Sequence, residues 1–255
     1  MSTKVTDPNA KGSSGFIWAI VALLVIVAAV IGYIVWNGQG AKTASLAERE
    51  QQDVNMTVEY ADGAITLSSE KATKDTPTVE LFEDFACPHC ADLAVATDGD
   101  MKTAIEDGSL NVAIRPLNFL DVSGSLDEAT LAGATGHSTK GVAATIELAK
   151  SGNAAAYWNL RNTLMVDQQV VYNKWEMKDF ADAAKQFGAD DATVDAIKDA
   201  DLKADGGDIA AANAMELKEE TGQVSSPRVI HDGKDLIGDN EDITTWVEKA
   251  QGLKD

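Results

Sequence analysis

The sequence predicts an α/β fold in which a block of helices is inserted into a sheet, with one membrane helix in front of it. Three observations predict this fold. An uninterrupted apolar stretch covers residues 16–36. A strand, a helix and a second strand follow one another between residues 78 and 117. Residues 121–220 then carry apolar side chains at helical spacing, before strand patterns return near residue 229.

The first element is the apolar segment 16–36, which contains no charged residue. About 20 helical residues span the hydrocarbon core of a bilayer, and Trp18, Tyr33 and Trp36 lie near the ends, where interfacial aromatics belong. A cleaved signal peptide is the alternative, but its apolar region is usually only about 7–15 residues long. We therefore expect an uncleaved transmembrane anchor.

The flanks of this segment give its expected orientation. Residues 1–15 are predicted to be a cytoplasmic tail, because Lys4, Lys11 and the amino terminus slightly outweigh Lys42 and Arg49 on the other side. Residues 37–53 are polar and are predicted to be a tether. The protein is then a single-pass protein of the cell membrane, with the domain after the tether on the extracytoplasmic side.

The sheet begins with a hairpin. Residues 57–60 and 64–67 are β-prone and are separated by Asp62-Gly63, a two-residue turn signal. Residues 78–82 form the next predicted strand, and helical character follows from Cys87. We expect Gly99 to interrupt this helix and Gly108 to end it. With a strand at 110–117 this makes a βαβ unit with parallel strands.

The inserted block is predicted to hold four or five helices. It begins with a capping box formed by Ser125 and Glu128. Its large aromatic residues recur at helical spacing, which favours core packing over the alternative, a hydrophobic substrate groove. They are Trp158, Trp175, Phe180 and Phe187.

Strands return at 229–231 and 236–237 around the turn Asp232-Gly233, and a last helix is expected over 241–251. The sheet domain is therefore assigned to residues 54–120 and 221–255, and the inserted helical domain to 121–220.

The only two cysteines of the chain stand three residues apart as Cys87-Pro88-His89-Cys90, directly after an apolar strand. A CxxC pair that opens a helix in a βαβ unit is the redox-active arrangement of thioredoxin-like proteins. Half of a zinc site is the alternative, but the only other histidines are His137 and His231 and no thiolate is left over. We interpret the pair as redox-active and expect no bound metal.

The predicted roles within this motif follow from the helix. Cys87 at the helix N-terminus faces unpaired N–H groups, which favour its thiolate and make it the nucleophile. Cys90 lies one turn along and can resolve a mixed disulfide. Pro88 loses no useful donor in the first turn. His89 adds a donor or a positive charge near the sulfur.

The formal net charge of −20 argues against nucleic acid and anionic membrane surfaces as partners, because both would repel the chain. No further cysteine is present to form a structural disulfide. The chain is therefore expected to act on the disulfides of other proteins.

Three motifs give the sequence a family resemblance. They are VELFEDFACPHC at residues 79–90, RPLNF at 115–119 and VSSP at 224–227. With them, residues 56–251 resemble the DsbA-type thiol:disulfide oxidoreductases of the thioredoxin superfamily, in which a helical domain is inserted into a thioredoxin fold. The membrane-anchored form is similar to the disulfide-forming enzymes of Gram-positive bacteria, especially actinobacteria.

The resemblance implies further site residues. It implies that Ser226-Pro227 is a cis peptide that faces the cysteines and binds substrate. Many members have an acid six residues before the first cysteine, where this chain has Leu81. Glu83 and Asp84 are therefore candidate proton relays. A second departure is Arg228, which stands after the proline where a small polar residue is usual.

The implied function is an oxidase that needs no cofactor and introduces disulfides into unfolded secreted or cell-surface proteins. A quinone-linked membrane reoxidase would restore its own disulfide. A disulfide reductase or isomerase stays open, because sequence does not fix the direction. A module in which Cys87, Cys90 and a histidine bind copper is a further alternative.

Overall fold

The structure is a computed structural model that describes residues 18–29, 42–43, 46 and 49–253. The chain divides into two units, residues 1–44 and 45–255. In the first unit, residues 18–29 form a helix whose large apolar side chains are exposed. Taken over the described positions, no helix has both the length and the apolarity needed to cross a bilayer. The remainder of the predicted anchor, 16–17 and 30–36, and the predicted tail 1–15 lie outside the described residues.

The second unit contains one sheet, with six strands among its described residues in the order β1-β2-β4-β3-β5-β6. The strands are β1 (Thr57–Ala61), β2 (Ala64–Ser68), β3 (Thr78–Asp84), β4 (Asn111–Leu117), β5 (Arg228–His231) and β6 (Lys234–Asp235). β3 and β4 pair in parallel, and every other neighbouring pair is antiparallel. The predicted βαβ unit is thereby confirmed.

Both hairpin turns form where the sequence predicts them. Asp62-Gly63 and Asp232-Gly233 have positive φ at both positions, which suits the twist of a two-residue hairpin. The last strand lies two residues earlier than expected, because β6 pairs Lys234 with His231 directly across the second turn. Residues 236–237 follow that strand.

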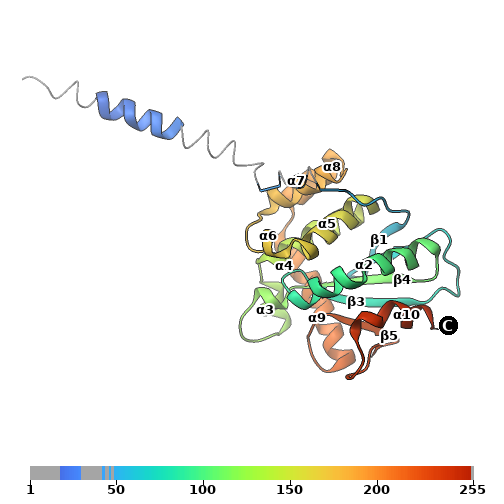
Figure 1. Ribbon diagram of the computed structural model, residues 1–255. Helices are drawn as coiled ribbons and strands as arrows, with labels where there is room; N and C mark the ends of the chain where they lie inside the picture. The colour runs from blue at the N-terminus through green and yellow to red at the C-terminus, as the bar shows by residue number, and fades with distance from the viewer. Residues whose placement is uncertain (1–17, 30–41, 44–45, 47–48, 254–255) are drawn as a thin grey trace, which may run out of the picture. The chain divides into compact units, whose positions relative to one another are not determined.

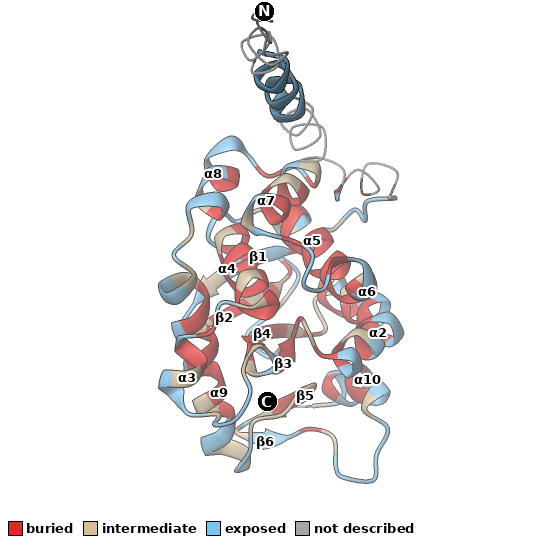
Figure 2. Ribbon diagram, turned by 90° about the vertical axis from the view of Figure 1, so that its left-hand side faces the viewer, coloured by how far each residue is buried: buried red, intermediate tan, exposed pale blue. Residues whose placement is uncertain are grey.

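Helices cover both faces of the sheet (Figure 2). On one face lie α2 (Pro88–Asp107), which crosses β3 and β4 in Figure 1, and α10 (Trp246–Gln251). On the other face lie α4 (His137–Lys150) and α9 (Asp208–Thr221). The helix expected over 241–251 is divided into a 3₁₀ turn, η4 (Ile243–Thr245), and α10.

The predicted break of α2 at Gly99 is wrong, because the helix runs without interruption from Pro88 to Asp107. Its buried face continues past the glycine, with Leu93 before it and Met101 and Ile105 after it. Gly108 ends the helix with a φ of 82°, as expected for a left-handed cap.

The inserted block holds more helices than predicted. Residues 119–221, all of which are described, form seven α-helices, a 3₁₀ turn and a π-helical turn. The helices not yet given are α3 (Glu128–Ala132), α5 (Ala154–Val166), α6 (Gln168–Val171), α7 (Met177–Gln186) and α8 (Asp191–Asp199); the turns are η2 (Phe119–Asp121) and η3 (Leu202–Gly207). The loops between these helices are too short to be recognised by periodicity alone.

The predicted capping box at Ser125 is also wrong. Asp127 is the N-cap of α3, and its carboxylate accepts the backbone N–H of Thr130. The aromatic residues of the block are core residues, as favoured. Trp158, Trp175, Phe180 and Phe187 are each no more than 3% exposed.

Residues 49–53, which the sequence assigns to the tether, lie against the helical block. Arg49 donates to the side chains of Asp167 and Asn162. The backbone N–H of Gln52 donates to Asn159, and its side-chain carbonyl accepts the indole N–H of Trp158 at 2.8 Å. The polar side chains of this segment therefore bind α5 in place of water.

Candidate active site

The two cysteines lie at the start of α2. Cys87 is the N-cap residue with extended backbone angles, and Pro88 is the first helical residue, where its missing N–H leaves no hydrogen bond unmade. Both cysteines are free and buried, at 5% and 2% exposure, whereas Pro88 and His89 are exposed. The structure is therefore that of the dithiol.

The two thiols differ in acidity. The pKa of Cys87 is lowered to about 5, chiefly by a hydrogen bond from Cys90, with further contributions from Ser226 and the backbone N–H groups of Cys90 and His89. The pKa of Cys90 is raised well above its usual value, first by burial and then by the adjacent Cys87 sulfur. His89 thus contributes its backbone N–H to the Cys87 thiolate.

The Ser226-Pro227 peptide is cis, as expected, and faces the cysteines. The Cys87 thiol donates to the Ser226 carbonyl oxygen at 3.5 Å. Pro227 and Cys90 line the same small cavity. The Ser226 hydroxyl is buried beside the cysteine sulfurs. Backbone groups of this loop therefore lie within reach of any group bound at Cys87.

Strand alternation separates the two candidate acids. Successive side chains of a strand point to opposite faces, so Leu81 and Glu83 share the face that α2 covers and Asp84 points to the other. Leu81 and Glu83 both line the cavity that holds Cys90. Glu83 is 2% exposed, and burial raises the pKa of its carboxyl while Arg161 lowers it.

Asp84 stabilises the turn before Cys87. Its carboxylate accepts the backbone N–H groups of Ala86 and Leu120 and the hydroxyl of Ser138. Burial raises the pKa of this carboxyl to about 7. Asp84 does not line the cavity beside Cys90, so of the two candidate relays only Glu83 shares that cavity with the thiol.

Arg161 and Asp98 are site residues that the sequence analysis did not identify. Arg161, in α5, donates to both carboxylate oxygens of Glu83, at 2.8 and 2.7 Å, and to Asp98 of α2 at 2.9 Å. Both residues line the cavity with Cys90. A signal was present, because Arg161 is the only charged residue in an otherwise uncharged helix.

Gln168 was missed as well. Its side-chain amide donates to the carbonyl oxygens of Phe85 and Cys87, at 2.9 and 3.0 Å, and is buried. The short helix α6 of the inserted block is thereby fixed to the turn that carries Cys87. No local sequence pattern marks a glutamine for this contact.

Arg228 forms part of the final hairpin. Its guanidinium pairs with the carboxylate of Asp235 and donates to the hydroxyl of Ser225 at 3.0 Å. Together with Pro227 these residues line a second, open pocket beside the cis-proline loop. The side chain that departs from the usual pattern therefore lies next to the loop.

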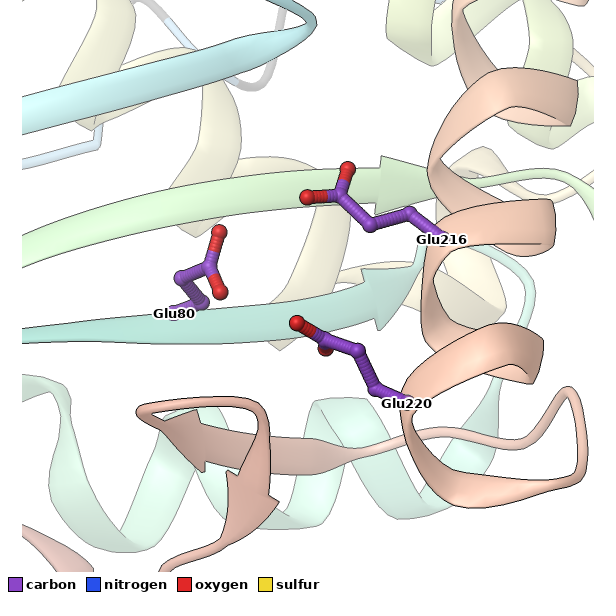
Figure 3. Close-up of side chains that lie close together, drawn as sticks. All are labelled: Glu80, Glu216 and Glu220. Atoms are coloured by element: carbon purple, nitrogen blue, oxygen red, sulfur yellow. The ribbon is translucent and has the colours of Figure 1, made fainter.

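Glu80, Glu216 and Glu220 gather on the opposite face of the sheet, where their carboxylates lie within 4.8 Å of one another (Figure 3). Arg115 pairs with Glu80 at 2.6 Å and with Glu216 at 2.8 Å, which makes the cluster an ion-pair network. Among the described residues, no third metal-ligating side chain joins Cys87 and Cys90. The arrangement required for the copper-binding alternative is thus not formed there.

The fold and the site define a class. A CxxC pair opens a helix after the central strand of the sheet, and a cis-proline loop faces it, which is the arrangement of a thioredoxin-family thiol:disulfide oxidoreductase. A sequence family described as thioredoxin matches residues 63–249, and the chain belongs to it.

Solved structures narrow the class to the DsbA type. MdbA from Corynebacterium diphtheriae, a thiol-disulfide oxidoreductase, is 42% identical, with a TM-score of 0.72 over 81% of this chain and 99% of that one. MdbA from Corynebacterium matruchotii is 40% identical, with a TM-score of 0.71 over 82% and 97%. DsbA from Mycobacterium tuberculosis, at 14% identity and a TM-score of 0.55 over 75% and 94%, shares the fold.

A search among proteins with curated functions finds no match. The structural likeness nevertheless covers nearly the whole of both corynebacterial proteins. The chain is a DsbA-like thiol:disulfide oxidoreductase.

Proposed function

We propose that this oxidoreductase is a membrane-anchored oxidase that introduces disulfide bonds into unfolded secreted or cell-surface proteins. The observation that carries the proposal is the contrast between the two thiols, because the pKa of Cys87 is lowered to about 5 and that of Cys90 is raised. A stabilised thiolate at the first cysteine favours the reduced enzyme, so its disulfide is a strong oxidant.

The exchange runs in two steps. A substrate thiolate attacks the Cys87 sulfur of the oxidised enzyme, the Cys87–Cys90 bond breaks, and Cys90 leaves with the electron pair and takes up a proton. The second thiolate of the substrate then attacks the first substrate sulfur, which is bonded to Cys87, and Cys87 leaves as a thiolate. The substrate leaves with a disulfide and the enzyme leaves as the dithiol, which a quinone-linked membrane reoxidase returns to the disulfide.

We assign roles in this exchange to the surrounding residues. Backbone groups of Ser226 and Pro227 bind the substrate chain beside Cys87, since the Ser226 carbonyl oxygen lies 3.5 Å from the Cys87 sulfur. Glu83 exchanges the proton of Cys90, because both line one cavity. Pro88 and His89 are exposed and lie where the substrate approaches.

The proposed location is the extracytoplasmic side of the cell membrane, with residues 16–36 as the anchor. The absence of charge in this segment and the exposed apolar side chains of helix 18–29 support an anchor. A dithiol that forms disulfides requires an oxidising compartment. The net charge of −20 leaves nucleic acid an unfavourable partner.

The test is the redox equilibrium of the full-length protein with glutathione, followed by the mass shift of a thiol-specific reagent at Cys87 and Cys90. We expect a potential near the strongly oxidising end, about −120 mV. A value near about −270 mV would make the protein a reductase. Cys87→Ser is the control, because it cannot form the Cys87–Cys90 disulfide.

A further inference from the structure

Arg161 links the inserted helical block to the redox site. It is a fully buried arginine of α5, at 1% exposure, and it joins one carboxylate from β3 to one from α2. Glu83 receives two of its N–H groups and Asp98 a third. Asn162 extends the cluster with a weaker contact of 3.4 Å to Asp98.

The charges that face Glu83 come from two elements. From α5 they are Arg161 and the phenol of Tyr157, whose pKa burial raises so that it stays neutral. From α2 they are Asp98 and the Cys90 thiol, which shares the cavity. Burial raises the pKa of Glu83 most strongly, Arg161 lowers it, and Asp98 raises it. The ionised state of Glu83 therefore depends on Arg161.

We propose that Arg161 is a positioning residue for disulfide exchange: it keeps Glu83 ionised beside Cys90 and thereby sets the pH range in which Cys90 gives up its proton. The inference rests on the proposed role of Glu83 as the proton acceptor of Cys90. It assigns to the inserted block a charged group that acts on the chemistry of the sheet domain.

The step in question is the closure of the enzyme's own disulfide. Cys90 gives its proton to the Glu83 carboxylate, and the Cys90 thiolate attacks the Cys87 sulfur of a mixed disulfide. The bond between Cys87 and its partner breaks, and the partner leaves as a thiolate. Glu83 then returns the proton to water. Without Arg161, the pKa of the buried Glu83 would rise further, and a protonated Glu83 cannot start this sequence.

The experiment measures this step in the full-length protein. The reduced enzyme is mixed with oxidised glutathione, and the decay of the Cys87–glutathione adduct is followed by acid quenching and mass, from about pH 4 to about pH 9. In Arg161→Gln we expect the midpoint of the pH profile to rise by about 1–3 units, the usual effect of removing an adjacent opposite charge. In Asp98→Asn we expect it to fall, because a negative charge is lost.

Opposite shifts in these two variants are a result that a purely structural role for the cluster would not produce. Arg161→Lys keeps the positive charge but loses the bidentate contact with Glu83. We expect the midpoint of its pH profile to lie between those of the wild type and Arg161→Gln. Arg115→Gln is the matched control, since Arg115 also pairs with two carboxylates, Glu80 and Glu216, but does not line the cavity with Cys90. Its profile should equal that of the wild type.

Unchanged midpoints, or shifts in the same direction, would overturn the role of Arg161. If Arg161→Gln does not fold, Asp98→Asn and Arg161→Lys still decide. A wild-type profile in Glu83→Gln would remove the relay itself, and the inference with it. The pH profile does not distinguish an oxidase from a reductase, because closure and opening of the disulfide use the same proton transfer. The redox potential tests the oxidase direction separately.

Discussion

His137 and Asp84 are buried side chains whose pKa values move in opposite directions. His137 begins α4 and lies among Tyr172 and Phe180, with no hydrogen-bond partner among the described residues for either ring nitrogen. Burial lowers its pKa from 6.5 to about 4. Burial raises the pKa of Asp84 from 3.8 to about 7. Both groups are therefore neutral over much of the range between pH 4 and pH 7.

The two groups affect stability with opposite sign. Between pH 6.5 and pH 4 the unfolded chain binds a proton at His137 and the folded chain does not, so stability falls as the pH falls. Between pH 7 and pH 3.8 the folded chain binds a proton at Asp84 and the unfolded chain does not, so stability rises as the pH falls. Each effect amounts to about 3–4 kcal/mol, so they largely cancel.

Replacement of His137 therefore reveals the effect of Asp84. In His137→Leu we expect the free energy of unfolding to increase from pH 7 to pH 5, and to exceed that of the wild type at pH 5 by about 2 kcal/mol more than at pH 7. Urea unfolding at both pH values measures this. Asp84→Asn is the opposite control and should lose stability on acidification. Parallel pH profiles for the wild type and His137→Leu would contradict the account.

For single residues, the sequence predicts those features of the site that a short motif determines. Cys87, Cys90 and the helix start follow from one motif, and the family resemblance implied the cis Ser226-Pro227 bond. Strand alternation alone would have favoured Glu83 over Asp84 as the acid near Cys90, since Glu83 has the parity of Leu81. Arg161 stands out as the only charged residue of its helix, but its partners could not be predicted, because they lie 78 and 63 residues away in the chain.

Among the elements, α2 shows why glycine is an uncertain helix breaker. A glycine in a helix costs about 1 kcal/mol relative to alanine, which burial of Leu93, Met101 and Ile105 along one face outweighs. Gly108 ends the helix because its left-handed conformation, and not its propensity, is required there. Sequence does not distinguish the two glycines until the buried face is known.

Two helical glycines provide a matched test of packing at this scale. A Cβ at Gly99 would meet no atom within 4 Å, whereas one at Gly141 of α4 would lie 2.7 Å from the ring of Phe85, in the turn before Cys87. We expect Gly99→Ala to stabilise the protein by about 0.5–1 kcal/mol. Gly141→Ala should destabilise it by about 1–3 kcal/mol through overpacking. Thermal unfolding of both variants checks the difference.

The functional consequence should follow the same division. Because Phe85 is two residues from Cys87, Gly141→Ala is expected to change the rate at which Cys87 is alkylated, whereas Gly99→Ala leaves it as in the wild type. Equal stability and equal thiol reactivity in the two variants would show that the packing of α4 against Phe85 does not affect Cys87.

At the scale of the whole molecule, two helices of the inserted block contact the redox turn, residues 84–87. Gln168 of α6 fixes the carbonyls of Phe85 and Cys87, and Ser138 of α4 binds Asp84 and the backbone N–H of Ala86. The order of strands and helices was predictable, because periodicity changes at the domain boundaries. The contacts of Gln168 and Ser138 were not predictable, because each depends on how the inserted block packs against the sheet.

Orientation of the whole chain in the membrane is the last property that the proposal requires. The chain has only two cysteines, and Cys87 is the more acidic of them, so a charged, membrane-impermeant thiol reagent has one favoured target. With the catalytic domain outside, intact spheroplasts reduced with an impermeant phosphine should be labelled at Cys87 as completely as lysed ones. Cys87→Ser should lose most of the signal, since Cys90 is buried with a raised pKa. Labelling that appears only after lysis would place the dithiol in the cytoplasm, where an oxidase could not keep its disulfide.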